Sequence, residues 1–251
     1  MNVDVKFGLD ADIRQLRIDL AAAFRLAVEF DWHESVSNHF SASVSDDGTR
    51  FLMNRKWQHF SEIRASDLIL FDATDIGGDF AREKADPSAW SIHGHIHRLV
   101  LHARVVLHCH PPYATALASL KDPRLKAIDQ ATARFFGLIG LDLQFGGLAD
   151  ERSEGQRIAT RLGEFPILMM GNHGVTVSAR TVAEAFHHLY YLERAARTLI
   201  LAYSSGQPLA EMPDALAAST ADDWISYNDQ AFAHFDAMKR RLDRIDPSYR
   251  D

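Results

Sequence analysis

Apolar residues recur at helical spacing in several parts of the chain, and each part predicts an amphipathic helix. One of these helices opens at Pro87, a residue that favours the first turn. Another begins with Thr181 and Glu184, which together form a capping-box pattern. The chain past Pro213 is helical and polar in character, but its pattern does not place it in the fold. The predicted helices cover residues 16–28, 87–103, 113–120, 150–162 and 181–200.

Short apolar segments between these helices predict strands. Residues 40–44 alternate between apolar residues and serines, and Asp47-Gly48 is a turn sequence that joins them to residues 51–53 in a hairpin. Residues 105–110 predict a further strand, which Pro111-Pro112 ends. The other predicted strands are 68–71, closed by Gly77-Gly78, and the hairpin of 167–170 with 175–177. Helices mixed with short strands and hairpins indicate an α/β or α+β layered domain.

Composition restricts the class of protein without naming its function. The 251 residues are 47 % hydrophobic and 24 % charged, as expected for a globular chain with one large core. Net charge is −7 with scattered basic residues, which argues against nucleic acid as a partner. We see neither a secretory signal nor a run long enough to cross a membrane, and Cys109 is the single cysteine, so we expect a cytoplasmic protein without membrane contact.

Histidine is the residue type that stands out. The chain has 13 histidines, and six of them fall within 18 residues. Clustered histidine in a folded domain favours a metal site or an acid/base site. The six are His93, His95, His97, His102, His108 and His110.

Two of these histidines, His108 and His110, lie two residues apart on a predicted strand. Because side chains alternate across a strand, both imidazoles should point to one face and Cys109 to the other. His173 stands in a glycine-flanked turn, Gly171-Asn172-His173-Gly174, from which it could reach the same point. Three histidines with an open fourth position form a catalytic zinc site, but the pattern also allows a turn histidine bonded to nearby backbone.

The core motif joins residues 91–97, with an internal histidine, to residues 105–111, a strand ending in His-x-His. This motif and three others, four in all and in the right order along the chain, resemble the class II aldolase/adducin family. Residues 172–174 resemble the family's third-histidine turn, residues 37–41 its early asparagine–serine loop, and residues 185–194 the helix that follows. The similarity covers residues 12–205, so we expect one domain over 1–251 with a helical tail over 206–251.

The resemblance implies a three-layer α/β/α fold around a mostly antiparallel sheet, assembled as a homotetramer. It also implies that His108, His110 and His173 bind one divalent metal. Zinc is the expected ion, with manganese, cobalt and iron as alternatives, because an all-histidine set suits zinc.

The chain also departs from the family. The sugar-phosphate aldolases carry a glutamate four residues before the helix histidine, where this chain has Ala89, as in the adducin-like branch. Only Ser88 remains of a serine pair that helps to hold a substrate phosphate, so Ser88 is a candidate substrate contact and a phosphorylated substrate stays open. Asp129-Gln130 stands where some relatives have an assisting tyrosine.

Other residues must then supply the remaining chemistry. His93 faces the same side of its helix as Ala89 and is the candidate catalytic base, with a structural role as the alternative. Asn38 is the candidate substrate contact in the early loop. We expect His95 and His102 to be solvated.

Three functions follow from these expectations. The first is a metal-dependent, aldolase-like lyase that acts on a small hydroxy-carbonyl or sugar-acid-like substrate through a metal-stabilised enediolate. Cleavage, epimerisation and decarboxylation all pass through such an anion, so the residues do not choose among them. The alternatives are a non-haem iron oxygenase on the same scaffold and a non-catalytic, adducin-like binding or assembly domain.

Overall fold

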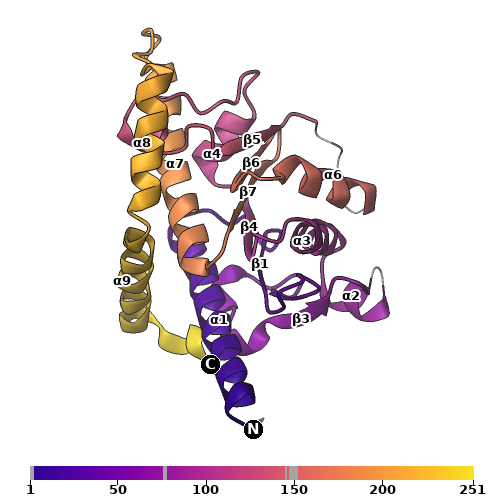
Figure 1. The fold of residues 1–251 in the computed structure, drawn as a ribbon. Helices are drawn as coiled ribbons and strands as arrows, with labels where there is room; N and C mark the ends of the chain where they lie inside the picture. The colour runs from indigo at the N-terminus through magenta and orange to yellow at the C-terminus, as the bar shows by residue number, and fades with distance from the viewer. Residues whose placement is uncertain (1–2, 76–77, 145, 147–151) are drawn as a thin grey trace.

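The fold is built on one central sheet, seen edge-on in Figure 1 in a computed structural model that describes residues 3–75, 78–144, 146 and 152–251. In the described chain the sheet has seven strands in the order β3-β2-β1-β4-β7-β6-β5. Among the strands of the described residues only β5 and β6 pair in parallel, so the predicted mostly antiparallel sheet is confirmed. The strands are β1 (His39–Ser43), β2 (Arg50–Met53), β3 (Ile69–Asp72), β4 (Val105–Cys109), β5 (Ile139–Asp142), β6 (Ile167–Met170) and β7 (Gly174–Ala179).

Helices cover both faces of the sheet and complete the three-layer α/β/α fold that was expected. On one face α3 packs against α6, and on the other α1 and α7 cross the strands (Figure 1). The last two helices, α8 and α9, lie along the outer side of α7. The α-helices are α1 (Val3–Glu29), α2 (Asp79–Lys84), α3 (Pro87–Leu99), α4 (Pro112–Ala118), α5 (Gln130–Ala133), α6 (Arg152–Leu162), α7 (Val182–Ser204), α8 (Asp214–Ser226) and α9 (Asp229–Ile245).

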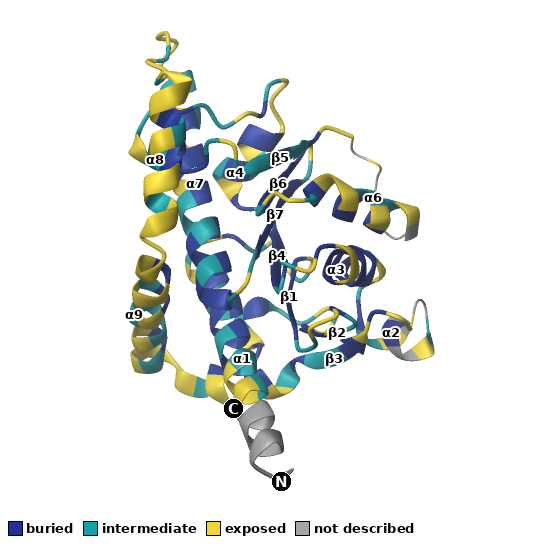
Figure 2. Ribbon diagram, in the orientation of Figure 1, coloured by how far each residue is buried: buried dark blue, intermediate teal, exposed yellow. Residues whose placement is uncertain are grey.

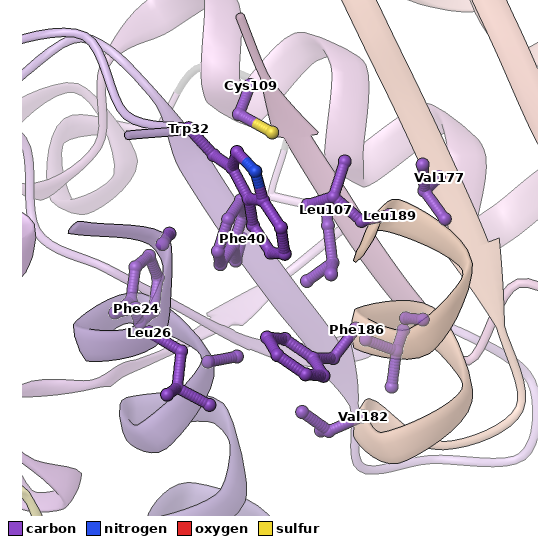
Figure 3. Packing of buried hydrophobic residues seen from close by; sticks show 14 of the residues in the cluster. Phe24, Leu26, Trp32, Phe40, Leu107, Cys109, Val177, Val182, Phe186 and Leu189 are labelled. Atoms are coloured by element: carbon purple, nitrogen blue, oxygen red, sulfur yellow. The ribbon is translucent and has the colours of Figure 1, made fainter. Parts of the chain in front are cut away.

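The larger hydrophobic core lies between the sheet and the layer of α1 and α7 (Figure 3). Alternate residues of β4 enter it, so Leu107 and Cys109 pack beside the aromatic rings of Phe24 and Phe40, whose centroids are 4.8 Å apart. Phe186 of α7 is buried in the same cluster. Figure 2 shows the corresponding pattern, with buried inner faces and exposed outer faces on the helices.

The opposite face of the central strands is more polar. It holds a small apolar cluster between α3, α6 and the sheet, which includes Ile92 and Val106. The alternation that sends Leu107 to the large core turns His108 away from it, and in the pairing of β1 with β4 His39 lies opposite His108. Histidine and hydroxyl side chains therefore meet beneath α3, and this layer contains the candidate site.

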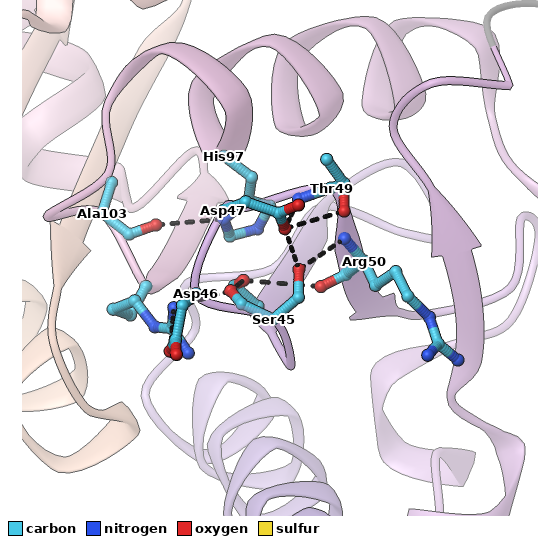
Figure 4. Close-up of polar contacts among 9 residues, drawn as sticks. Ser45, Asp46, Asp47, Thr49, Arg50, His97 and Ala103 are labelled. Atoms are coloured by element: carbon cyan, nitrogen blue, oxygen red, sulfur yellow. Dashed lines mark hydrogen bonds and ion pairs between the residues drawn. The ribbon is translucent and has the colours of Figure 1, made fainter.

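The predicted turn at Asp47-Gly48 joins β1 to β2 and lies against the end of α3 (Figure 4). The Asp47 carboxylate accepts hydrogen bonds from the backbone N–H and the hydroxyl of Thr49, at 3.0 and 2.8 Å. Gly48 has φ +69°, and a Cβ there would lie 1.8 Å from the backbone oxygen of His97. Glycine is therefore required both by the left-handed backbone and by the close approach to the helix.

The structure also contains elements that the sequence pattern did not predict. The first helix begins at Val3 rather than near residue 16, and α2, α5 and β5 were not predicted. The tail, which the sequence could not place, forms α8 and α9, and α9 inserts Phe235 into the large core beside α7. Asp150, the expected start of α6, and Gly77 lie outside the described residues. In the described chain we find no helix with the length and apolar character needed to cross a membrane.

Candidate metal centre

Three histidines converge at the end of β4. His108 lies on the strand, His110 directly follows it, and His173 comes from the turn between β6 and β7. Their ring centroids are 4.8 to 5.3 Å apart, and one ring nitrogen from each lies within 4.8 Å of the other two. The structure thus brings together the three residues that the sequence pattern had suggested.

Asn172 and Gly174 allow the turn between β6 and β7 to lie close to the end of β4. Asn172 has φ +55°, a conformation that asparagine tolerates better than most residues. A Cβ on Gly174 would lie 2.5 Å from the Cδ2 atom of His110. A larger residue at 174 would therefore displace the His110 ring or the backbone at Cys109.

The hydrogen bonds of His108 and His110 fix which nitrogen of each ring is free. Thr176 donates its hydroxyl to the sulfur of Met170 at 3.3 Å, so its oxygen accepts from His108 Nδ1–H at 3.1 Å. His110 Nδ1 donates to the carboxylate of Glu34. Nε2 is then the remaining nitrogen of each ring, and that of His110 is buried with no hydrogen-bond partner in the described part of the chain.

Burial keeps His108 and His173 neutral, which is the state that binds a metal. It lowers the pKa of His108 well below the usual range, with the neighbouring histidines acting in the same direction. Burial, followed by the influence of His110, also lowers the pKa of His173 to about 4.

A chain of buried hydrogen bonds runs from α3 to the edge of this site. His97 Nδ1 lies 3.0 Å from the backbone oxygen of Ala103, which can only accept, so that nitrogen donates (Figure 4). Burial lowers the pKa of His97 to about 4, so the ring is neutral and its Nε2 accepts from the hydroxyl of Ser41 at 2.7 Å. The Ser41 oxygen then accepts from His93 Nδ1–H, and His93 Nε2 accepts from His39 Nδ1–H at 2.8 Å.

The direction of this chain determines the state of His39. Its proton lies on Nδ1, which leaves a lone pair on Nε2. The His39 ring stacks on His108 with centroids 4.8 Å apart and planes 22° apart. Burial lowers the pKa of His39 to about 3, although Asp86 opposes this shift.

The other predicted residues have different surroundings. Asn38 is 2 % exposed, and neither atom of its side-chain amide has a hydrogen-bond partner in the described residues. Ser88 lies in the first turn of α3, where its hydroxyl donates to Asp86, the N-cap residue. Ala89 is buried in an apolar cluster with Trp90. The prediction that His95 is solvated is wrong, because its ring is buried and bonds to the backbone oxygen of Ser91 at 2.7 Å.

Sequence reasoning had not singled out His39 and Glu34 as site residues. The only signal for His39 was its alternation with Phe40, which places it on the same face as Ser41. Glu34 lies in the loop after α1, 76 positions from His110, and no local pattern connects the two.

The donor set fits a divalent metal. Three neutral imidazoles with room for a further ligand are the arrangement of catalytic zinc sites, and imidazole also suits copper, iron and nickel. A carboxylate that accepts from the outer nitrogen of a ligand histidine, as Glu34 does from His110, is a common supporting contact in metal sites.

The sequence and fold of this chain have counterparts among known proteins. The family described as "Class II Aldolase and Adducin N-terminal domain" matches residues 18–200, and the chain belongs to this family. The Pseudomonas aeruginosa protein named "Putative aldolase class 2 protein" is 29 % identical over 98 % of this chain and 96 % of its own length. An adducin-related protein of Schizosaccharomyces pombe is 29 % identical over 93 % of this chain and 76 % of its own length.

A solved structure agrees with these relatives. The aldolase II superfamily protein from Pseudomonas syringae is 30 % identical and superposes with a TM-score of 0.85 over 95 % of this chain and 96 % of its own. The predicted fold class and family resemblance are therefore confirmed.

Proposed function

We propose that the protein is a metal-dependent lyase for a small substrate with neighbouring hydroxyl and carbonyl groups, such as a sugar acid. The observation that supports this most strongly is the histidine triad with its buried, unpartnered Nε2 on His110. An imidazole nitrogen held without a partner beside two others is costly unless something binds there.

The triad would hold one divalent ion, with zinc as the first candidate. Such an ion supplies positive charge that favours the loss of a proton, or the cleavage of a carbon–carbon bond, next to a carbonyl group. Glu34 orients His110, and Thr176 orients His108, so that both rings present Nε2 to the same point.

Neighbouring residues would bind and orient the substrate. His39 Nε2 is an acceptor for a substrate hydroxyl at the edge of the triad, and the Asn38 amide offers a donor and an acceptor. His93 would contribute to the chemistry indirectly. Both of its ring nitrogens are hydrogen-bonded, so it would act by fixing the tautomer of His39. Ser88 keeps its proposed role as a substrate contact at the start of α3.

The first test is the metal content of the purified protein, measured beside a His108→Ala/His110→Ala double variant. We expect about one zinc, manganese or cobalt ion per chain, and its loss in the variant. The metal-loaded protein is then screened against hydroxy-carbonyl and sugar-acid substrates, with and without a phosphate group. Iron together with oxygen consumption would favour the oxygenase alternative, and the absence of metal from both proteins would contradict the lyase.

A second candidate function is adducin-like binding or assembly without catalysis. It is favoured by Ala89, which gives the chain no carboxylate at that position of α3, and by the similarity to an adducin-related protein. Under this proposal, His93→Gln and His39→Gln variants would retain the assembly state and all binding.

Both candidates are compatible with a cytoplasmic homotetramer. Sedimentation of the purified protein tests the proposed assembly of four chains. A dimer or a monomer at micromolar concentration would contradict it.

A further inference from the structure

A second polar site lies away from the triad, where α8 crosses α7 beside the segment after α5. A cavity of about 240 Å³ opens there, and the triad contributes no lining residue. Its walls come from three parts of the chain: the segment after α5, the first turns of α7 and the end of α8. The lining residues used below are Arg134, Leu138, Glu184, His188, Trp224 and Ile225.

Arg134 is the feature of this cavity that needs a partner. Its side chain is buried at 7 % exposure and makes no hydrogen bond or ion pair with any residue that the structure describes. Nη1 is buried and unpartnered. Buried charges in proteins are normally paired, because an isolated guanidinium loses its hydration without compensation.

Contacts with aromatic rings compensate only partly for the lost hydration of the Arg134 guanidinium. The guanidinium carbon lies 4.6 Å from the centre of the Tyr191 ring and 4.7 Å from that of Trp224. The two ring centres lie 6.2 Å apart, so the rings contact the group from neighbouring directions and not from its two opposite faces. These contacts hold the guanidinium in place, but they do not accept hydrogen bonds in its plane, where its N–H groups point.

The other polar residues of the cavity do not neutralise Arg134. The Glu184 carboxylate accepts hydrogen bonds from Asn228 at 2.8 Å and from Thr181 at 2.9 and 3.0 Å. Both of its oxygens are therefore engaged in hydrogen bonds to residues other than Arg134. Burial, followed by the charge of Arg134, lowers the pKa of His188 to about 4, and its ring is neutral. His188 Nδ1 is also buried without a partner in the described residues.

We propose that this cavity binds a small monocarboxylate with an apolar body, whose carboxylate pairs with Arg134. A carboxylate matches the planar fork of a guanidinium, and its single charge suits a cavity that has only one unpaired positive group and also contains Glu184. Trp224, Leu138 and Ile225 would contact the apolar part. The volume is below that of typical drug-sized pockets, which restricts the ligand to a small one.

Benzoate is the probe, titrated calorimetrically into the full-length protein with a chelator present, so that it cannot bind through a metal at the triad. We expect saturable binding by the wild type and a loss of affinity of about tenfold or more in Arg134→Gln. Arg161→Gln removes the same charge from an exposed position on α6 and should bind as the wild type does. Benzamide, which has the same shape without the charge, should bind about tenfold or more weakly.

Two results would overturn the proposal: no binding of benzoate by the wild type, or equal affinity in wild type and Arg134→Gln. If Arg134→Gln does not fold by circular dichroism, Leu138→Glu replaces it. Leu138 is only partly buried and lines the cavity, so a carboxylate there should compete with benzoate and weaken its binding. Wild-type affinity in Leu138→Glu would then count against the site.

Discussion

The buried imidazole of His97 should make the stability of the protein depend on pH in a way that one substitution removes. The ring is 1 % exposed, and both nitrogens are engaged, Nδ1 with the Ala103 oxygen and Nε2 with the Ser41 hydroxyl. Burial is the main cause that lowers its pKa to about 4 from 6.5, and the charge of Arg104 acts in the same direction. The bond to Ala103 opposes the shift.

The sign of the effect follows from the two states. Below its ordinary pKa of 6.5 the histidine takes up a proton in the unfolded chain but not in the folded one. Its contribution to stability is therefore complete above pH 6.5 and is lost as the pH falls toward 4. One pKa unit corresponds to about 1.4 kcal/mol, so lowering the pH from about 7.5 to about 5.5 should cost the wild type about 1.4 kcal/mol through this residue.

His97→Gln tests this reasoning, because glutamine can still donate to Ala103 and accept from Ser41 but does not titrate. The free energies of unfolding of both proteins are measured by urea denaturation at the two pH values, with a chelator present. The wild type should be the more stable at about pH 7.5, and its advantage should shrink by about 1.4 kcal/mol at about pH 5.5. An equal difference at both pH values would show that the folded protein protonates His97 as readily as the unfolded chain does.

Three further substitutions test the site and the packing. His173→Ala should lower the metal content measured by elemental analysis from about one ion per chain to near zero; unchanged content would rule out the three-histidine site. Glu34→Gln removes the charge that faces His110 Nδ1, so zinc affinity in a chelator competition should fall about 10- to 100-fold, and equal affinity would mean that the carboxylate does not support the ligand. Phe186→Ala removes a fully buried ring from the large core and should lower the free energy of unfolding, measured in urea, by about 3–5 kcal/mol; a loss below about 1 kcal/mol would indicate that the ring is not packed as described.

The parts of the fold that follow from local pattern were predictable. The alternation in residues 105–110 indicated both the strand and the separation of His108 from Cys109, and the structure places Cys109 in the large core. The capping-box pattern at Thr181 marked the start of α7, where the Thr181 side chain accepts from the Glu184 backbone N–H. β5 was not predicted, because Ile139–Asp142 is short and contains a glycine, and its burial depends on pairing with β6.

The candidate site was predictable only where its residues repeat a local spacing. The alternating pattern of the strand identified His108 and His110, and the glycine-flanked turn identified His173. Their supporting partners come from elsewhere: Glu34 from the loop after α1 and Thr176 from β7. These contacts depend on how the strands and loops pack in the folded chain, so the periodicity of the sequence does not predict them.

The role of His93 changes once its surroundings are known, and this change shows what sequence position alone leaves out. Helical spacing put His93 on the same side of α3 as Ala89, and this made it the candidate catalytic base, with a structural role as the alternative. In the structure its two nitrogens are taken by Ser41 and His39, so a direct encounter would require breaking a buried hydrogen bond. The His39 ring stacks on His108 at the edge of the triad, and the lone pair on its Nε2 depends on His93 holding the proton of His39 on Nδ1. A His93→Gln variant can still accept from His39 and should preserve that tautomer, whereas His93→Leu would release it. A difference in activity between these two variants would separate positioning by His93 from direct catalysis, which neither variant could perform.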